Sequence, residues 1–283
     1  MARVRALVAA GGVRVNGQVL KAAGRPVRAG QRVEALVRPE LLRPRATASD
    51  RPFRLTPAHV LFRDGALLAV DKPPGLPTHA TADASRPSLV GHVESFLAAA
   101  GAGTYVAVHQ RLDRDTSGIV LFAIDPRANH DLARAFSGRE VEKTYVALTA
   151  RPAILPRRGL LVSAPLSAPV SGGSSRVTVG GESAKVAETE VAVREVLADA
   201  LLVEARPLTG RKHQVRAHLA HAGMPILGDT VYGDDALGRA PRLMLHARRL
   251  ALPHPLTGQP LVIESPLPAD FEAVLARLRS AGR

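Results

Sequence analysis

One stretch limits the possible structure of this chain more than any other: a polar run at residues 109–118 leads directly into an apolar run at residues 119–123. The apolar run is rich in β-branched residues and follows turn-forming residues, so it is predicted to be a buried strand. Asp113 then lies on the loop that enters the sheet, where a side chain can meet a ligand while its neighbours stay in place. The same residues would also suit a surface turn with an ion pair ahead of a strand.

Composition narrows the class of protein. At 283 residues the chain suits one core of ordinary size with a small appendage. It has no cysteine, which excludes disulfides, thiolate metal sites and cysteine nucleophiles. No stretch approaches the roughly 18 consecutive apolar residues of a membrane span. We therefore expect a protein of the cytoplasm that does not enter a membrane.

The charge of the chain is strongly positive and unevenly distributed. The net charge is +13, and residues 1–50 alone hold ten basic and three acidic side chains, an excess of +7. The ten basic residues are Arg3, Arg5, Arg14, Lys21, Arg25, Arg28, Arg32, Arg38, Arg43 and Arg45. Biased codon usage would spread arginine evenly along the chain, so the asymmetry indicates a polyanionic partner. Nucleic acid is favoured over a membrane because no amphipathic basic helix of useful length is visible.

The chain divides into three predicted parts. Residues 1–40 hold a short helix at 3–10, a hairpin around Asn16 and Gly17, and a strand that ends at Val37. Residues 41–57 contain several prolines and no apolar periodicity, which predicts a linker. Residues 58–283 form the main domain.

Apolar periodicity in the main domain predicts both strands and helices. The expected strands are 67–70, 119–123, 143–148, 189–193, 200–205, 243–252 and 260–264, and the expected helices are 88–100, 129–136, 213–222 and 271–278. Residues 152–181 are rich in Pro, Gly and Ser and are predicted to be a long loop. Hairpins outnumber βαβ units, so we expect an α+β fold with a mixed, largely antiparallel sheet.

Four motifs, in this order, resemble those of the RluA-type RNA pseudouridine synthases. They are Asp-Lys-Pro-Pro-Gly-Leu-Pro-Thr-His at residues 71–79, Arg-Leu-Asp-Arg-Asp-Thr-Ser-Gly at 111–118, Glu-Lys-Thr-Tyr-Val-Ala at 142–147, and Thr-Gly-Arg-Lys-His-Gln-Val-Arg-Ala-His-Leu at 209–219. The chain departs from the family at Gln110, which separates His109 from the Arg-Leu-Asp triplet. Residues 1–40 resemble the later part of an S4-type RNA-binding module.

The resemblance implies a pseudouridine synthase-like domain with a central cleft, in which one aspartate isomerises uridine without a metal or other cofactor. It implies that Asp113 attacks the uridine, that Tyr145 stacks on the flipped base and removes the C5 proton, and that Arg211 pairs with Asp113. Arg111 matches an arginine that enters the RNA where the base leaves its stack. The residues expected to bind RNA are Arg111, Arg114, Lys143, His213, Gln214, Arg216, Arg3, Arg14 and Arg28.

The chemistry of the residues is compatible with these roles. Asp113 has a short side chain, a loop position and nearby arginines that would keep it ionised. Asp115 would point away in an extended segment, so the paired carboxylates of a classical glycosidase are not expected. Tyr145 would equally suit the core of a strand. His213, His218 and His221 share a helical face only in part and have no acidic partner, so a metal site is not predicted.

The expected partner is RNA, with ribosomal RNA favoured over tRNA, and the protein is expected to be a monomer. Two alternatives remain open. One is a ribosome-assembly factor that keeps the fold without the reaction, which the presence of Asp113, Tyr145 and Arg211 argues against. The other is a hydrolase that cleaves the glycosidic bond and releases free uracil.

Overall fold

The structure is a computed structural model of the 283-residue chain. It describes residues 12–20, 28–35, 53–80, 87–155, 159–168, 176–233 and 240–281. The chain forms two compact units, Met1–Pro52 and Phe53–Arg283, and the boundary between them falls within the stretch predicted to be a linker. None of the helices in the described ranges has the length and apolar character that a membrane crossing requires.

The described part of the first unit is a small antiparallel sheet in the order β2-β1-β3. β1 (Val13–Val15) and β2 (Gln18–Val19) form the predicted hairpin, and β3 (Val33–Ala35) is the predicted strand. Asn16 and Gly17 have φ angles of 51° and 78°, the left-handed values that a two-residue type I′ turn requires. The helix predicted at residues 3–10 lies outside the described residues.

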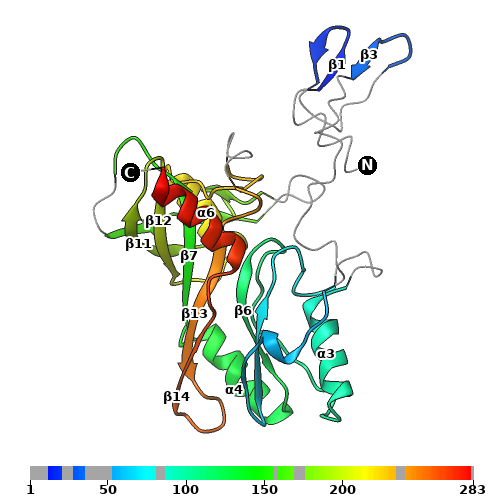
Figure 1. The fold of residues 1–283 in the computed structure, drawn as a ribbon, viewed down its shortest axis with the longest axis vertical. Coiled ribbons are helices and arrows are strands. Elements are labelled where there is room, and N and C mark those ends of the chain that lie inside the picture. Colours follow the sequence, from blue (N-terminus) through cyan, green and yellow to red (C-terminus); the bar gives the residue numbers. More distant parts are fainter. Residues whose placement is uncertain are drawn as a thin grey trace. The chain divides into compact units, whose positions relative to one another are not determined.

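A nine-stranded sheet organises the second unit (Figure 1). Its order is β4-β5-β6-β13-β7-β12-β11-β8, and β14 pairs with the remaining length of β13. Every pairing is antiparallel except that of β6 with β13, so the prediction of a mixed, largely antiparallel sheet is confirmed. The strands are β4 (Val60–Arg63), β5 (Leu67–Lys72), β6 (Ser117–Ala123), β7 (Glu142–Ala150), β8 (Gly159–Ser163), β11 (Glu188–Val196), β12 (Ala200–Pro207), β13 (Leu245–Pro253) and β14 (Pro260–Glu264).

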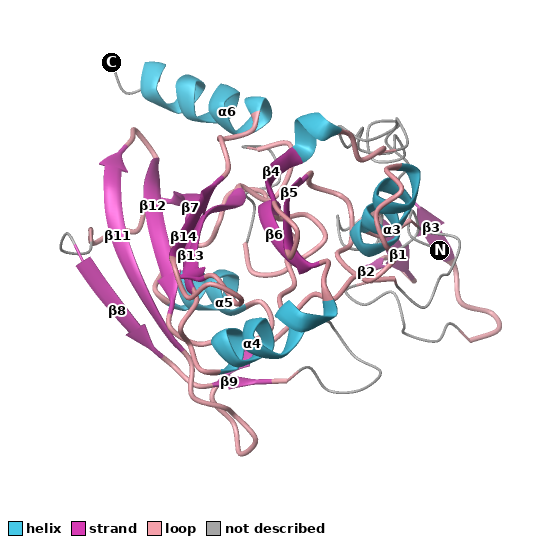
Figure 2. Cartoon of the chain, turned by 90° about the horizontal axis from the view of Figure 1, so that it is seen from below, coloured by secondary structure: helices cyan, strands magenta, loops and turns pink. Residues whose placement is uncertain are grey.

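Among the described residues, four α-helices pack on this sheet (Figure 2). α3 (Leu89–Ala99) and α4 (Pro126–Ser137) pack on opposite faces of β5 and β6, because alternate side chains of a strand point to opposite faces. Thus Leu68 and Val120 join the core under α3, while Leu67 and Ile119 join the core under α4. α5 (Gln214–His221) and α6 (Ala269–Ser280) share one core with β7, β11, β12 and β13. A 3₁₀ turn, η1 (Pro57–His59), precedes β4.

Local signals account for where two of these helices begin. The Ser88 side chain accepts a hydrogen bond from Gly91 N and caps α3, as predicted. α4 begins at Pro126, three residues before the predicted start, because the Asp125 side chain accepts from Arg127 N and Pro126 occupies the first turn.

The prediction of a long loop at residues 152–181 is wrong, because three short strands lie in it. β8 pairs with β11 over five residues, and β9 (Leu166–Ser167) pairs with β10 (Thr178–Val179). Strands as short as β9 and β10 have no detectable periodicity, and β8 depends on a partner later in the chain. Side-chain patterning therefore gives no local signal for them.

The two halves of the sheet meet where β6 and β13 run side by side, a contact that we call the seam. It consists of two residue pairs, Ser117 with His246 and Gly118 with Ala247. A Cβ atom on Gly118 would lie 2.3 Å from Ala247 O, so only glycine allows the backbones to approach this closely. The Ser117 Oγ and His246 Nδ1 atoms are 3.0 Å apart. The seam therefore holds the loop ahead of β6 against the half of the sheet that carries β7 and α5.

Candidate active site

The loop ahead of β6 carries Asp113 into a cleft of about 460 Å³. One wall comes from the half of the sheet with β6 and includes His79, Arg111 and Thr116. The other comes from β7 and the segment before α5 and includes Tyr145 and His213. The Asp113 side chain is 19% exposed, which leaves it open to a ligand while most of its surface is covered. The structure therefore contains the central cleft that the resemblance implies.

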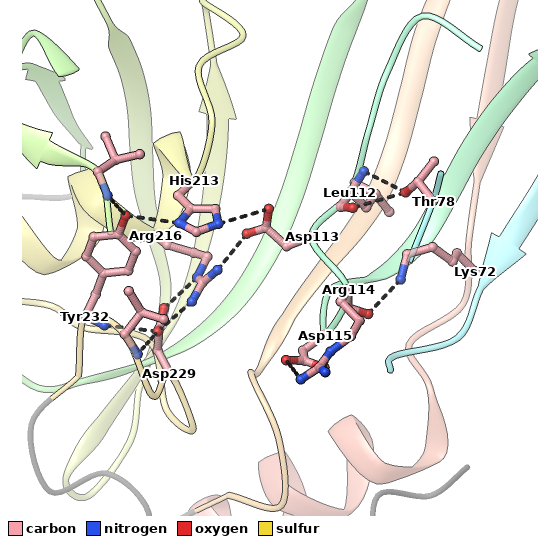
Figure 3. Close-up of polar contacts among 12 residues, drawn as sticks. Lys72, Thr78, Leu112, Asp113, Arg114, Asp115, His213, Arg216, Asp229 and Tyr232 are labelled. Carbon is pink, nitrogen blue, oxygen red and sulfur yellow. Dashed lines mark hydrogen bonds and ion pairs between the residues drawn. The ribbon is translucent and has the colours of Figure 1, made fainter. Parts of the chain in front are cut away.

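Both neighbours of Asp113 in the chain are held by hydrogen bonds to the segment after β5 (Figure 3). The Thr78 hydroxyl donates to Leu112 O at 3.0 Å, and Leu112 N donates back to Thr78 Oγ1 at 3.2 Å. The Lys72 ammonium donates to Arg114 O at 3.0 Å. Because the peptide groups on either side are tied, Asp113 has little freedom to leave the cleft.

Lys72 is fully buried, which is rare for lysine. Its Nζ donates to the carbonyl oxygens of Pro73 at 3.0 Å, Leu76 at 2.9 Å and Arg114, so all three ammonium hydrogens have acceptors. Burial lowers the pKa of Lys72 to about 7, although the charges of Asp115 and Asp113 act in the opposite direction. Lys72 therefore joins the proline-rich segment at residues 73–77 to the loop that bears Asp113.

Arg216 holds the Asp113 carboxylate. Its Nη1 donates to Asp113 Oδ2 at 2.8 Å, and its Nε and Nη2 donate to the two oxygens of Asp229, both at 2.8 Å. Burial opposes the charge of Arg216, but the hydrogen bonds and charges of Asp229 and Asp113 outweigh it and raise the pKa of Arg216. Burial alone would raise the pKa of Asp229. The hydrogen bonds and charge of Arg216, together with hydrogen bonds from backbone N–H groups, outweigh burial and lower this pKa. One guanidinium thus bridges two carboxylates.

The prediction that Arg211 pairs with Asp113 is wrong. The Arg211 Nε donates to Val186 O at 3.1 Å, and its backbone N donates to Gln214 Oε1 at 2.9 Å. Arg211 belongs to the turn before α5, whereas Arg216 lies within the helix on the side that faces Asp113. Arg211 still lines the cleft, where its side chain is partly exposed.

Tyr145 lies on β7 and lines the same cleft as Asp113. Its ring is in contact with two of the hydrophobic cores, one on each side of the seam. Burial, and then the negative charge of Asp113, raise the pKa of Tyr145. Its hydroxyl therefore keeps its proton at neutral pH.

Six of the nine residues predicted to bind RNA separate into two groups. Arg111 and Arg114 are exposed beside Asp113, and Lys143 lies in the cleft with its Nζ 5.1 Å from the centre of the Phe136 ring. Arg14 and Arg28 are exposed on the first unit, and Arg3 lies outside the described residues. RNA contact by these side chains stays a prediction.

Gln214, Arg216 and His213 line the cleft with polar groups that face other protein groups, and their contact with RNA stays a prediction. Gln214 is buried; its Oε1 accepts from the Thr209 hydroxyl at 2.7 Å, and its Nε2 donates to Glu188 O at 2.8 Å. Arg216 bridges the two carboxylates, and the ring nitrogens of His213 face Asp113 and Tyr232. These three residues build the wall of the cleft.

Sequence reasoning missed four residues that shape the site: Lys72, Thr78, Asp229 and Tyr232. Lys72 and Thr78 lie inside the first motif, where a lysine and a threonine beside prolines indicate a rigid loop but no partner. Asp229 follows the apolar pair at residues 226–227 and a glycine, a turn pattern that could have drawn attention to a short carboxylate. No pattern singles out Tyr232.

The three clustered histidines have separate surroundings. The His218 Nδ1 lies 2.8 Å from Thr189 Oγ1 and its Nε2 lies 2.9 Å from Ala164 O, both inside the protein. His213 faces the cleft, whereas His221 is exposed at the end of α5. Within the described ranges, no group of three or more His, Asp or Glu side chains is arranged to hold a metal ion.

The cleft thus brings together a carboxylate held by a guanidinium and a tyrosine. The family model described as RNA pseudouridylate synthase matches residues 66–221, and the chain belongs to this family. A model of the S4 domain matches residues 1–33. The resemblance found in the four motifs and in the N-terminal segment is confirmed.

Relatives and solved structures agree with this family. The chain is 35% identical over 230 residues to ribosomal large subunit pseudouridine synthase D of Nitrosomonas europaea, covering 79% of this chain and 66% of the relative. It is 31% identical to ribosomal large subunit pseudouridine synthase C of Escherichia coli, covering 90% and 78%. Human RNA pseudouridylate synthase domain containing 4 superposes with a TM-score of 0.65 at 27% identity, covering 78% and 93%. The matches span slightly less than two thirds of the Nitrosomonas relative and less than half of several others.

Proposed function

We propose that this protein is an RNA pseudouridine synthase, which converts specific uridines of structured RNA, ribosomal rather than transfer RNA, to pseudouridine. The observation that carries the proposal is the Asp113–Arg216 pair in the cleft beside Tyr145. The names of the two bacterial relatives favour ribosomal RNA, and the S4 match supports RNA as the partner. A monomeric state and a location in the cytoplasm stay predictions.

In the proposed reaction, an Asp113 oxygen attacks C1′ of a uridine that has left its stack. The bond from C1′ to N1 of the base breaks, and the base leaves as a uracil anion. The base then turns so that C5 attacks C1′, which releases the carboxylate. Loss of the C5 proton and gain of a proton at N1 complete an isomerisation in which no atom is gained or lost overall.

Each neighbour of Asp113 has a defined task in this scheme. Arg216 keeps the carboxylate charged when the closing cleft removes water, which would otherwise favour protonation. Tyr145 supports the base by stacking. Because the pKa of Tyr145 is raised, its hydroxyl can accept the C5 proton only if it gives its own proton to N1 of the base in the same step, which leaves the tyrosine unchanged.

The test is Asp113→Asn, which keeps the shape of the side chain and removes the nucleophile. We expect turnover to vanish while RNA binding stays near that of the wild type. Asp115→Asn is the matched control, since Asp115 is a carboxylate paired with the exposed Arg114 and should be dispensable for the chemical steps. Pseudouridine, which has the same mass as uridine, is separated from it by liquid chromatography of digested RNA and counted by mass spectrometry, with free uracil as the sign of a hydrolase. Substantial pseudouridine from Asp113→Asn would refute the proposal.

A further inference from the structure

Tyr232 is held from several sides, although it does not line the cleft. It is 8% exposed, and its ring centre lies 5.3 Å from the Arg216 guanidinium and 5.4 Å from that of Arg176. Its backbone N donates to Asp229 Oδ1 at 3.1 Å. The edge of its ring meets His213 at a centroid distance of 5.8 Å and an angle of 86°. Its hydroxyl therefore occupies a defined place.

Two groups of the protein lie within hydrogen-bond distance of that hydroxyl. Val177 N donates to Tyr232 Oη at 2.8 Å, and His213 Nδ1 lies 3.1 Å from the same oxygen. The Tyr232 oxygen already accepts from Val177 N, so its own hydrogen is available to an unprotonated Nδ1, and the donor and acceptor in this contact follow the tautomer of His213. A neutral imidazole that accepts at Nδ1 carries its own hydrogen on Nε2.

The Nε2 of His213 faces the nucleophile (Figure 3). It lies 3.6 Å from Asp113 Oδ1, while Arg216 Nη1 binds the other oxygen, Oδ2, at 2.8 Å. Contacts of catalytic groups are often long before substrate binds and shorten in the complex. The two carboxylate oxygens thus have different partners, and Oδ1, with the longer contact, is the one free to attack.

The backbone of His213 supports a specific placement of the ring. Its φ is 53°, a left-handed value that residues other than glycine seldom adopt. Such strain persists where the surroundings enforce it, and it is common at functional sites. Burial lowers the pKa of His213, with Asp113 opposing and Arg216 and Lys212 supporting the shift, so the ring is neutral at neutral pH.

We propose that Tyr232 is a positioning residue that holds His213 as the Nε2–H tautomer, so that His213 presents an N–H group to Asp113 Oδ1. This inference rests on the proposed function, in which Asp113 is the nucleophile. The N–H of His213 orients Oδ1 toward C1′, and Arg216 holds Oδ2. Tyr232 touches neither substrate nor Asp113 and acts through the ring of His213.

The first test is independent of turnover. Nitrogen-15 NMR of histidine-labelled protein identifies which ring nitrogen of His213 is protonated, with His213→Gln used to assign its signals. We expect a protonated Nε2 and an unprotonated Nδ1 in the wild type and in Asp113→Asn, and loss of this preference in Tyr232→Phe. A protonated Nδ1 in the wild type would overturn the proposal.

The second test is kinetic and uses His213→Gln, because a glutamine side chain does not have the two tautomers of an imidazole. Tyr232→Phe should lower kcat roughly tenfold or more with little change in KM, because the nucleophile is misdirected rather than the RNA released. His213→Gln keeps an N–H donor near the position of Nε2 and should retain more activity than His213→Leu. Adding Tyr232→Phe to His213→Gln should then have little further effect. Equal losses from Tyr232→Phe in both backgrounds would show that Tyr232 serves packing alone and would overturn the proposal.

Two controls separate this inference from other causes. Tyr105→Phe removes a hydroxyl from a partly buried tyrosine that does not line the cleft, and it should leave kcat and the His213 tautomer unchanged. Thermal unfolding of each variant reports any loss of fold. Activity in Asp113→Asn would refute the proposed function, while the NMR result judges the tautomer by itself.

Discussion

At the scale of single residues, the site depends on how one guanidinium is shared. Arg216 donates from Nη1 to Asp113 and from Nε and Nη2 to Asp229, and both carboxylates are largely buried. A buried carboxylate without a partner is costly and tends to take up a proton. Asp229 therefore anchors Arg216 from behind, and Arg216 keeps Asp113 charged in front.

Replacing either arginine of the last motif with lysine should distinguish their roles. Arg216→Lys keeps a positive charge but cannot reach both carboxylates, because one ammonium replaces a planar fork of donors. We expect turnover to fall roughly a hundredfold, as misplacement of catalytic groups commonly causes. Arg211→Lys is the matched control and should reduce turnover less than Arg216→Lys, since the Arg211 side chain donates to a backbone oxygen. Single-turnover conversion of uridine measures both.

The opposite order of effects would contradict this assignment. If Arg211→Lys lost more activity than Arg216→Lys, Arg211 rather than Arg216 would be the arginine that supports Asp113, as the motif alone predicted. Combining Arg216→Lys with Asp113→Asn adds a further check. The pair should be no worse than Asp113→Asn by itself, because both changes fail at the same step.

At the scale of elements, the seam between β6 and β13 decides whether the site is assembled. Gly118 has a φ of 111°, and its Cα lies directly against the backbone of Ala247. Gly118→Ala would place a methyl group 2.3 Å from Ala247 O, and the backbone atoms of a paired strand cannot readily move aside. We expect the variant to lose several kcal/mol of stability or to fail to fold, as overpacking and strain at a special φ together can cause.

Chemical denaturation of Gly118→Ala measures this loss, and Gly65→Ala provides the comparison. Nothing lies within 4 Å of a Cβ atom at Gly65, which is in the turn between β4 and β5. The effect there should be small. Equal stability of the two variants would mean that β6 and β13 can separate without harm.

The buried His246 side chain in the seam should also make the free energy of unfolding depend on pH. Burial lowers the pKa of His246 from an ordinary 6.5 to about 4. Below pH 6.5 the unfolded chain takes up a proton that the folded chain refuses. The free energy of unfolding should therefore be at its full value above pH 6.5 and should fall as the pH drops to 4, by on the order of 3 kcal/mol.

The pH dependence is tested by comparing wild type with His246→Gln in urea titrations from pH 4 to 7. The variant should have a shallower dependence, since it lacks the group that titrates. Some slope should remain, because burial also lowers the pKa of His218 and His213. Identical slopes in the two proteins would rule out His246 as the source.

At the scale of the whole molecule, the chain order of the helices and of the longer strands was predictable, but β8, β9, β10 and the long-range partners were not. Apolar periodicity and caps located β6, β7, α3 and α6 because those signals are local. The choice between Arg211 and Arg216 depends on how α5 faces a loop 103 residues earlier in the chain. The motif contains both arginines and does not distinguish them. Asp229 and Tyr232 act through contacts that only the folded chain brings together.

We expect the first compact unit to supply much of the RNA affinity and the second unit to carry out the reaction. The excess of +7 lies in residues 1–50, whereas Asp113, Tyr145 and Arg216 belong to the second unit. Phosphate contacts made by basic side chains supply much of the affinity for nucleic acid and make it depend on salt. We expect removal of residues 1–45 to weaken RNA binding and to flatten its salt dependence.

The measurement is the RNA dissociation constant of full-length and truncated protein at several salt concentrations. On a logarithmic plot, each neutralised phosphate contributes roughly 0.7 to 0.9 to the slope, so the difference in slope gives the number of phosphates that the removed segment neutralises. Arg14→Ser with Arg28→Ser in the full chain is the matched variant, because both side chains are exposed and the fold of the first unit should survive. It should reproduce part of the change. Single-turnover conversion at saturating protein should be retained in both proteins, since the cleft is intact. Unchanged affinity and slope after truncation would place the RNA-binding surface entirely on the second unit.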